Sequence, residues 1–200
     1  MVNGVQRALL RLWRHVPRRL RRWVVRVAAP SFTVGAACVV ERDDGQILLV
    51  QLTYRNGWGL PGGLIKRRED VGVCARREVG EEVGLDVELV GAPAVVVDAR
   101  PQRVDVVFRA RPAAGADPGA AAPCSPEIRA VRWFPADELP TLQHEAVSAL
   151  VALASSALGP VVDVRDDVPS AAPSSGPDGD GVALRAAAAA AAGQLSPGSA

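Results

Sequence analysis

The sequence predicts an α/β fold in which strands precede and follow a central helix and a second helix closes the domain. Two observations lead to this prediction. Runs rich in Val, Ile and Leu are bounded by Gly, Pro and Asp, as strands are. Apolar residues recur at helical spacing near residues 71–83 and again at 141–158. With 200 residues and a net charge of +1, we expect one domain with extensions. We expect an N-terminal extension at 1–30, the folded domain at 31–160 and a C-terminal tail at 161–200.

Residues 1–30 are predicted to form a basic amphipathic helical extension, with Pro17 beginning a second helix. Eight arginines and no acidic residue lie within positions 1–27. One interpretation is peripheral attachment to anionic lipid, since each basic residue near such a surface contributes about 1 kcal/mol. The other is a helix packed on the domain or on a partner. Nucleic acid is disfavoured, because a basic stripe alone does not specify it. Arg26 and Pro30 interrupt the apolar run, so we expect no transmembrane span.

The predicted domain begins with a strand at Phe32–Glu41, and Asp43, Asp44 and Gly45 suit a hairpin turn to the next strand. A helix then precedes three more strand-like segments, a loop rich in Pro, Ala and Gly, a last strand and a short turn. The final helix is expected to be capped by Thr141. The segments after the hairpin turn are 46–54, the helix from 69 to 84, 87–90, 94–98, 103–111, the loop 112–126, 127–134, the turn 135–140 and the helix 141–158.

The tail at 161–200 is low in core residues and rich in Ala, Pro, Ser and Gly, so it is predicted to be disordered. Alanines at 186–192 are expected to form helix without packing. Cys38, Cys74 and Cys124 share no metal-ligand spacing, which favours reduced thiols in a cytoplasmic protein. A single lysine, Lys66, beside abundant arginine and alanine indicates a GC-rich bacterial genome.

The central helix carries three carboxylates on one face. Glu81 and Glu82 lie three and four positions after Glu78. Like charges at this spacing cost about 0.2–0.5 kcal/mol per pair, and a hard divalent cation would reverse that cost because it seeks carboxylate oxygens. Gly84 suits the C-cap, and acidic residues at 69 and 70 suit the N-terminus. The pattern indicates a cation-binding helix.

The segment from 63 to 85 resembles a Nudix box, with the pattern G-x5-E-x7-R-E-U-x-E-E-x-G-U, where U is a bulky aliphatic residue. The preceding Trp58-Gly59-Leu60-Pro61-Gly62 is also similar to the usual lead-in of that family. All nine fixed positions match over twenty-three residues, and they are Gly63, Glu69, Arg77, Glu78, Val79, Glu81, Glu82, Gly84 and Leu85.

The resemblance implies a Nudix-type α/β/α sandwich with a mixed β-sheet. It also implies Mg²⁺, with Mn²⁺ as a substitute, held by the Gly63 carbonyl and by Glu78, Glu81 and Glu82. Glu69 would support the cluster either through a water or from behind the residues that bind the ion. Arg77 would orient Glu78 through a bidentate pair, so Arg77, Glu78 and Glu81 are predicted catalytic residues. The general base comes either from the box or from a downstream loop. Glu127 is the downstream candidate, and a solvated loop residue is the equally good alternative.

The implied function is divalent-metal-dependent hydrolysis of a pyrophosphate bond in a nucleoside diphosphate linked to another moiety. Nucleotide sugars, ADP-ribose, dinucleoside polyphosphates and nucleoside triphosphates all belong to this class. The alternative is a catalytically weak Nudix-fold module that binds or senses a nucleotide. A sensor is expected to have lost box carboxylates or to carry a DNA-binding domain, and neither feature is seen in the sequence.

Overall fold

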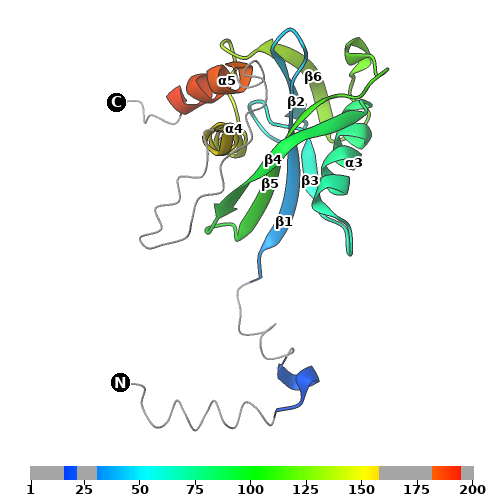
Figure 1. Ribbon diagram of the computed structural model, residues 1–200, viewed down its shortest axis with the longest axis vertical. Helices are drawn as coiled ribbons and strands as arrows, with labels where there is room; N and C mark the ends of the chain where they lie inside the picture. The colour runs from blue at the N-terminus through cyan, green and yellow to red at the C-terminus, as the bar shows by residue number, and fades with distance from the viewer. Residues whose placement is uncertain (1–15, 22–30, 158–181, 195–200) are drawn as a thin grey trace, which may run out of the picture.

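The computed structural model describes residues 16–21, 31–157 and 182–194, and its ordered domain is a sandwich of helices and a mixed sheet (Figure 1). The elements in chain order are β1 (Thr33–Val40), β2 (Gln46–Leu52), β3 (Gly62–Leu64), α3 (Val71–Val83), β4 (Val87–Asp98), β5 (Arg103–Pro112), the short 3-10 helix η1 (Pro118–Ala120), β6 (Ile128–Pro135), α4 (His144–Ala157) and α5 (Val182–Gly193).

Four strands form the larger sheet, in the order β3-β1-β5-β4. β1 and β5 run parallel, whereas β3 and β4 join the sheet antiparallel, so the sheet is mixed as predicted. β2 and β6 pair antiparallel as a second, two-stranded sheet. The chain turns between β1 and β2 where Asp43, Asp44 and Gly45 predicted it, with Gly45 in the left-handed region at φ 80°. The two strands do not form the predicted hairpin ladder, because a single bridge, Glu41 to Ile47, joins them and β2 pairs with β6 instead.

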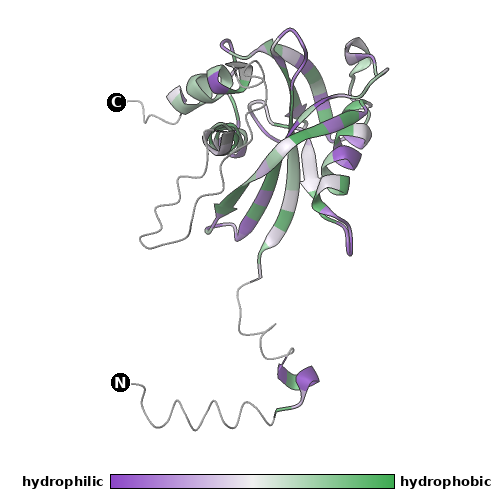
Figure 2. Cartoon of the chain, viewed as in Figure 1, coloured by the Kyte–Doolittle hydropathy of each residue, from purple (hydrophilic) through white to green (hydrophobic). Residues whose placement is uncertain are grey.

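The two faces of the strands build two separate cores. Along β2, Ile47 and Leu49 point to the core shared with α4 and α5, whereas Leu48 and Val50 point to the core under α3. This period-2 alternation is what a strand covered on both faces requires. Figure 1 shows α3 on one side of the strands and α4 with α5 on the other. Figure 2 shows the same division, with hydrophobic residues along the strands and hydrophilic ones in the loop before α3.

Several boundaries differ from the sequence prediction. The segments 87–90 and 94–98 are one strand, β4, with a register shift between Val90 and Ala94. α4 begins at His144, because the Gln143 carbonyl accepts the N–H groups of Ala146 and Val147. Thr141 is therefore not its cap. The carbonyl of Thr141 instead accepts from the N–H of Trp58 at 2.9 Å, which holds this segment against the neighbouring chain.

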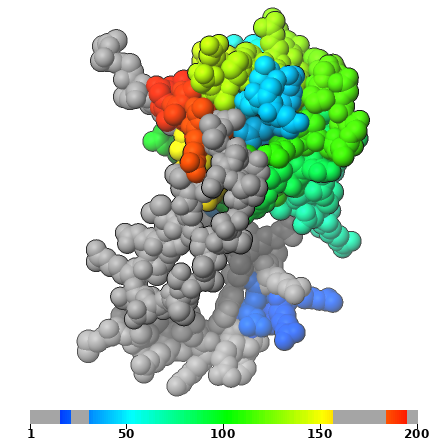
Figure 3. Space-filling model, turned by 45° about the horizontal axis from the view of Figure 1, so that its top comes forward, coloured from blue at the N-terminus to red at the C-terminus, as the bar shows by residue number. Residues whose placement is uncertain are grey.

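The C-terminal prediction is wrong for residues 182–194. They form α5, and Leu184, Ala187 and Ala191 are fully buried against α4. The side chain of Gln194 then donates to the carbonyl of Pro140 at 2.9 Å and accepts from the N–H of Leu142 at 2.8 Å. Figure 3 shows α5, in red and orange, beside the yellow-green segment that contains these partners. The small alanine side chains let α5 pack closely on α4, although the same alanine-rich composition favours a disordered tail. The other predictions for 161–200 fall outside the described residues.

The predicted N-terminal helix falls mostly outside the described residues. Within residues 16–21, positions 18–21 form one helical turn, and the Pro17 carbonyl accepts from the N–H of Arg21 at 3.0 Å. None of the described helices combines the length and the apolar character that crossing a bilayer requires.

Candidate active site

Asp70 and Gly84 fix the two ends of α3. The sequence predicted Gly84 as the C-cap, but it placed Glu69 and Asp70 within the helix, which begins only at Val71. Asp70 is the N-cap, and its side chain accepts from the backbone N–H groups of Gly72 at 2.9 Å and Val73 at 3.3 Å. Gly84 caps the C-terminus in the left-handed conformation, at φ 68°. Val79 and Val83 are fully buried under the sheet. The opposite, acidic face of the helix is thereby turned toward β3 and the loop that follows it.

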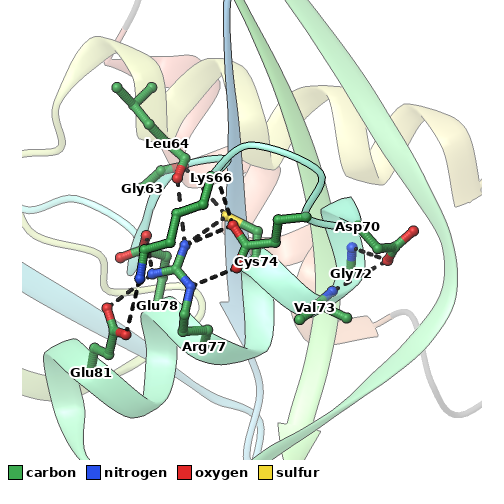
Figure 4. Close-up of polar contacts among 11 residues, drawn as sticks. Gly63, Leu64, Lys66, Asp70, Gly72, Val73, Cys74, Arg77, Glu78 and Glu81 are labelled. Atoms are coloured by element: carbon green, nitrogen blue, oxygen red, sulfur yellow. Dashed lines mark hydrogen bonds and ion pairs between the residues drawn. The ribbon is translucent and has the colours of Figure 1, made fainter.

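The Arg77 guanidinium lies at the centre of this acidic face (Figure 4). Its Nε and Nη2 donate to the two carboxylate oxygens of Glu69 at 2.7 and 3.0 Å, a bidentate pair. Its Nη1 donates to Glu78 at 2.7 Å and to Glu81 at 2.9 Å. The predicted bidentate pair with Glu78 is therefore wrong. Glu78 is adjacent in sequence and receives one bond, whereas Glu69 lies in the preceding loop and faces the guanidinium squarely.

Glu69 anchors this arrangement from outside the helix. Besides the Arg77 fork, it accepts from the backbone N–H of Lys66 at 2.7 Å. Hydrogen bonding to Arg77, followed by the Lys66 N–H, lowers the pKa of Glu69 to about 2. The carboxylate is thus ionised at any physiological pH. Its water-mediated support of a cation stays a prediction, and its contacts assign it first to holding Arg77.

Two glycines allow β3 to lie closely between its neighbours, Gly63 against the acidic face of α3 and Gly62 against β1. A Cβ at Gly63 would lie 2.5 Å from both Cδ and Oε1 of Glu78, and a Cβ at Gly62 would lie 2.4 Å from the Ala36 carbonyl oxygen. Both distances are far below van der Waals contact, so side chains cannot be accommodated without displacement. The close approach also lets the Gly62 N–H donate to Oε2 of Glu82 at 3.0 Å.

Glu82 occupies the other end of the cluster and is half-buried. Burial raises the pKa of its carboxyl to about 7, the Gly62 N–H acts in the opposite direction, and the charges of Glu78, Glu127 and Glu81 raise the pKa further. Without a bound cation, the Glu82 carboxyl therefore changes its protonation state near neutral pH.

Glu127 is brought to this end by the loop that precedes β6. The N–H groups of Ala122 and Cys124 donate to the carbonyls of Val83 and Glu82 at 3.1 and 2.9 Å, so this loop binds the C-terminal turn of α3. The Glu127 carbonyl accepts from the N–H of Thr53 at 2.9 Å. The loop rich in Pro, Ala and Gly is thus held at both sides of Glu127, whose side chain remains exposed.

Tyr54 was not singled out from the sequence. Its hydroxyl donates to Oε2 of Glu127 at 3.4 Å, although the two residues are 73 positions apart. The sequence gives only a weak indication that these two residues meet. Tyr54 ends one predicted strand and Glu127 begins another, but only the antiparallel pairing of β2 and β6 brings those ends together.

The donor set suits a hard divalent cation. Glu78 lies against Gly63, Glu81 shares the Nη1 of Arg77 with Glu78, and Glu82 accepts from the Gly62 N–H. Mg²⁺ prefers carboxylate and carbonyl oxygens such as these residues offer. A half-buried carboxylate with a raised pKa next to other carboxylates is a group that a cation would stabilise in its charged form. Within the described ranges, no three His, Cys, Asp or Glu side chains converge closely enough to enclose an ion. Glu78 and Glu81 are instead bonded to Arg77, so the residues fit as donors but are not closed into a cage.

Comparison with known proteins decides the family. The model of the NUDIX domain matches residues 31–153, more than half of the chain. The chain belongs to the NUDIX family. A MutT-like protein from Streptomyces ambofaciens is 31% identical to this NUDIX protein over 137 residues, which cover 68% of this chain and 86% of the relative.

Two further NUDIX relatives differ in what their names say. A CMP-5'-(N-acetyl-N-hydroxy-3-aminopropyl)phosphonate hydrolase from Streptomyces rubellomurinus is 36% identical over 110 residues, or 52% of each chain, so the match spans about half of that enzyme. The crystal structure of an ADP-ribose pyrophosphatase from Streptococcus suis matches at 29% identity and a TM-score of 0.51, covering 63% of this chain and 92% of that one.

These matches confirm the family resemblance, the α/β class with a mixed sheet, and the enzyme class. The chain is a Nudix-type pyrophosphohydrolase. The roles of individual site residues stay predictions.

Proposed function

We propose that this chain hydrolyses a pyrophosphate bond in a nucleoside diphosphate linked to another moiety, with Mg²⁺ as the cofactor and Mn²⁺ as a substitute. The observation that carries the proposal is the cluster of Glu69, Glu78 and Glu81 around Arg77. Gly63, which has no side chain, lies directly against the Glu78 carboxylate. The names of two relatives, a CMP-phosphonate hydrolase and an ADP-ribose pyrophosphatase, support a substrate of this class. Both names describe a nucleotide joined to a second group.

The residues divide the chemistry between them. Glu78, Glu81, Glu82 and the Gly63 carbonyl would hold the divalent ion. Once bound, such an ion neutralises the pyrophosphate charge and polarises a phosphoryl oxygen. Arg77 holds Glu78 and Glu81 in fixed positions, and Glu69 in turn fixes Arg77. The positioning of charged groups is the main contribution that a protein makes to phosphoryl chemistry.

Glu127 is the proposed general base. Its carboxylate accepts a proton from the attacking water as the new P–O bond forms and the bridging P–O bond breaks, which leaves two phosphate-bearing products. Support comes from its fixed backbone, from the hydrogen bond with Tyr54, and from its charge acting on Glu82. A base placed outside the cation-binding face keeps its lone pairs for the water.

A substrate panel tests the proposed function. Purified chain with Mg²⁺ should release mononucleotide products, identified by mass spectrometry, from at least one of ADP-ribose, UDP-glucose, a dinucleoside polyphosphate or a nucleoside triphosphate. Loss of turnover on chelation and recovery with Mg²⁺ or Mn²⁺ would establish the cofactor. If the chain hydrolyses no member of the panel with either ion, the proposal fails.

We also propose that residues 1–27 contact anionic membrane, which would make the protein cytoplasmic and membrane-peripheral. In the described turn at 18–21, Arg18 and Arg19 are exposed and Leu20 is 49% exposed, so basic and apolar groups both face solvent. Sedimentation with vesicles of phosphatidylglycerol, compared between the full chain and a form lacking residues 1–28, tests this. Equal binding by the two forms would refute the role of the segment.

A further inference from the structure

We infer that Tyr54 is a positioning residue, whose hydroxyl holds the Glu127 carboxylate at the Glu82 end of the site. The inference rests on the proposed function, in which Glu127 takes the proton from the attacking water. Tyr54 itself is not a catalytic residue, because it acts on the reaction only through Glu127.

The strand pairing sets the two side chains at the same end of one ladder. β2 and β6 run antiparallel, and Leu52 is the register partner of Ile128. The bond from the Thr53 N–H to the Glu127 carbonyl, at 2.9 Å, extends this pairing by one step beyond the strands. Tyr54 and Glu127 therefore leave the ladder together, and the backbone fixes their separation before either side chain contributes.

The other side of Glu127 is attached to the cation-binding helix. Cys124, three residues upstream, donates its N–H to the Glu82 carbonyl at 2.9 Å. The segment 124–127 thus links the C-terminal turn of α3 to the end of β2. With its backbone held at both ends, the remaining freedom of Glu127 is the rotation of its exposed side chain. The Tyr54 hydroxyl limits that freedom.

The exposure of Tyr54 argues against a packing role. Its side chain is 66% exposed, which is high for a large aromatic residue, and it does not belong to the buried clusters of the domain. The contact with Glu127, at 3.4 Å, is long for an O–H···O bond. Hydrogen bonds in active sites are often long before substrate binds and tighten in the complex.

The electrostatics of the phenol agree with this contact. Loss of hydration, followed by the negative charge of Glu127, raises the pKa of Tyr54, and the smaller influence of Glu82 acts in the same direction. Arg55 lowers it. Tyr54 is the only tyrosine in the sequence, so the ultraviolet difference signal of tyrosinate reports on this residue alone.

The first arm of the test needs no substrate. The ion-free wild-type chain and the Glu127→Gln variant are titrated through the alkaline range while tyrosinate absorbance is followed. Removing the Glu127 charge should lower the pKa of Tyr54 toward its ordinary value. Glu88→Gln, an exposed carboxylate on β4, is the matched control and should leave the titration unchanged. Identical curves for wild type and Glu127→Gln would overturn the inference.

The second arm is kinetic and uses the panel compound that the wild-type chain hydrolyses fastest with Mg²⁺. Tyr54→Phe, which removes only the hydroxyl, should lower kcat roughly three- to tenfold, the scale of one hydrogen bond, with KM unchanged. In the Glu127→Gln background the same substitution should have no further effect, because coupled residues are not additive. Asn56→Ala, two residues along the same exposed loop, serves as the control for loop disturbance.

The outcomes separate the inference from the proposed function. If the wild-type chain hydrolyses no panel compound, the function fails. If the wild type is active and Tyr54→Phe matches its kcat, or lowers kcat equally with and without Glu127, the inference is overturned and the function stands. A rise in KM alone would assign the ring to substrate binding and would also overturn the inference.

Discussion

The two ends of the carboxylate cluster balance their charge differently. At one end, Glu69, Glu78 and Glu81 all receive hydrogen bonds from the guanidinium of Arg77, at distances of 2.7 to 3.0 Å. At the other end, Glu82 receives the neutral N–H of Gly62, and the negative charge of Glu127 acts on it. The pKa of Glu69 falls to about 2, whereas that of Glu82 rises to about 7.

This contrast separates a structural end from a reactive end. The bonds to Arg77 keep Glu69 ionised and hold the carboxylates of Glu69, Glu78 and Glu81 in position. Within the described part of the chain, Glu82 has no guanidinium partner, so a bound cation would stabilise its charged form, and its carboxyl changes protonation near neutral pH. We therefore expect substitutions of Glu69 and Arg77 to act mainly by loosening the site. Substitutions of the proposed cation ligands, Glu82 above all, should act mainly on cation binding and chemistry.

Glu82→Gln should have the largest effect, because it removes a charge from the reactive end and keeps the side-chain shape. Groups aimed at developing charge are worth on the order of 10²–10³ in kcat each, and we expect a loss of that size with the fold intact. Steady-state kinetics with Mg²⁺ and circular dichroism measure the two properties. An unchanged rate would remove Glu82 from the reactive end.

Gly63→Ala should lower activity by roughly 10- to 100-fold, the scale found when a partner that orients a metal ligand is disturbed. The added Cβ would lie 2.5 Å from the Glu78 carboxylate and must displace it. Gly80→Ala is the matched control within α3, because its Cβ would meet no atom within 4 Å. The control should keep activity and gain about 1 kcal/mol of helix stability. Equal kinetics for the two variants would show that Glu78 tolerates displacement.

The sequence predicted the structural end well, because its determinants are local. The N-cap Asp70, the C-cap Gly84 and the helical spacing of the glutamates lie within one segment, and short-range geometry fixes their relations. The family pattern identified the same residues. What it did not provide was the partner of the Arg77 fork, because that choice depends on how the loop carrying Glu69 folds back onto the helix.

The contacts that sequence could not predict are long-range. Tyr54 meets Glu127 through the β2–β6 pairing, and buried Glu41 receives two bonds from Arg109 across the parallel pair β1–β5, 68 residues away. Neither strand pairing can be predicted from the residue pattern of the strands themselves. The helix α5 was missed for another reason. Its composition matched that of a disordered tail. The burial of Leu184, Ala187 and Ala191 in the core shared with α4 shows that this segment packs on the domain.

Arg77→Lys tests the structural end. A lysine keeps the positive charge but has no planar fork and only three N–H donors. It therefore cannot replace the four bonds of Arg77, two to Glu69 and one each to Glu78 and Glu81. We expect a lower Tm and a loss of activity of roughly tenfold, with the pKa of Glu82 less affected than by changes at its own end. Arg76→Lys, one position earlier and exposed, is the control. If Arg77→Lys matched this control in both Tm and rate, the guanidinium geometry would be irrelevant.

The smallest expected effect is a pH dependence of stability that arises at the reactive end. The pKa of Glu82 rises from 4.5 to about 7 on folding, so between these values the folded chain holds a proton that the unfolded chain releases. The resulting stabilisation is complete below pH 4.5 and is lost as pH rises through about 7. The Tm of the ion-free wild type should therefore fall from pH 5 to 8 more steeply than that of Glu82→Gln, which lacks this titration. Mg²⁺ should restore the wild type more at pH 8 than at pH 5, because the ionised carboxylate is the ligand. Parallel Tm–pH curves for the two ion-free proteins would mean that the pKa of Glu82 is not raised on folding. The contrast between the two ends of the cluster would then disappear.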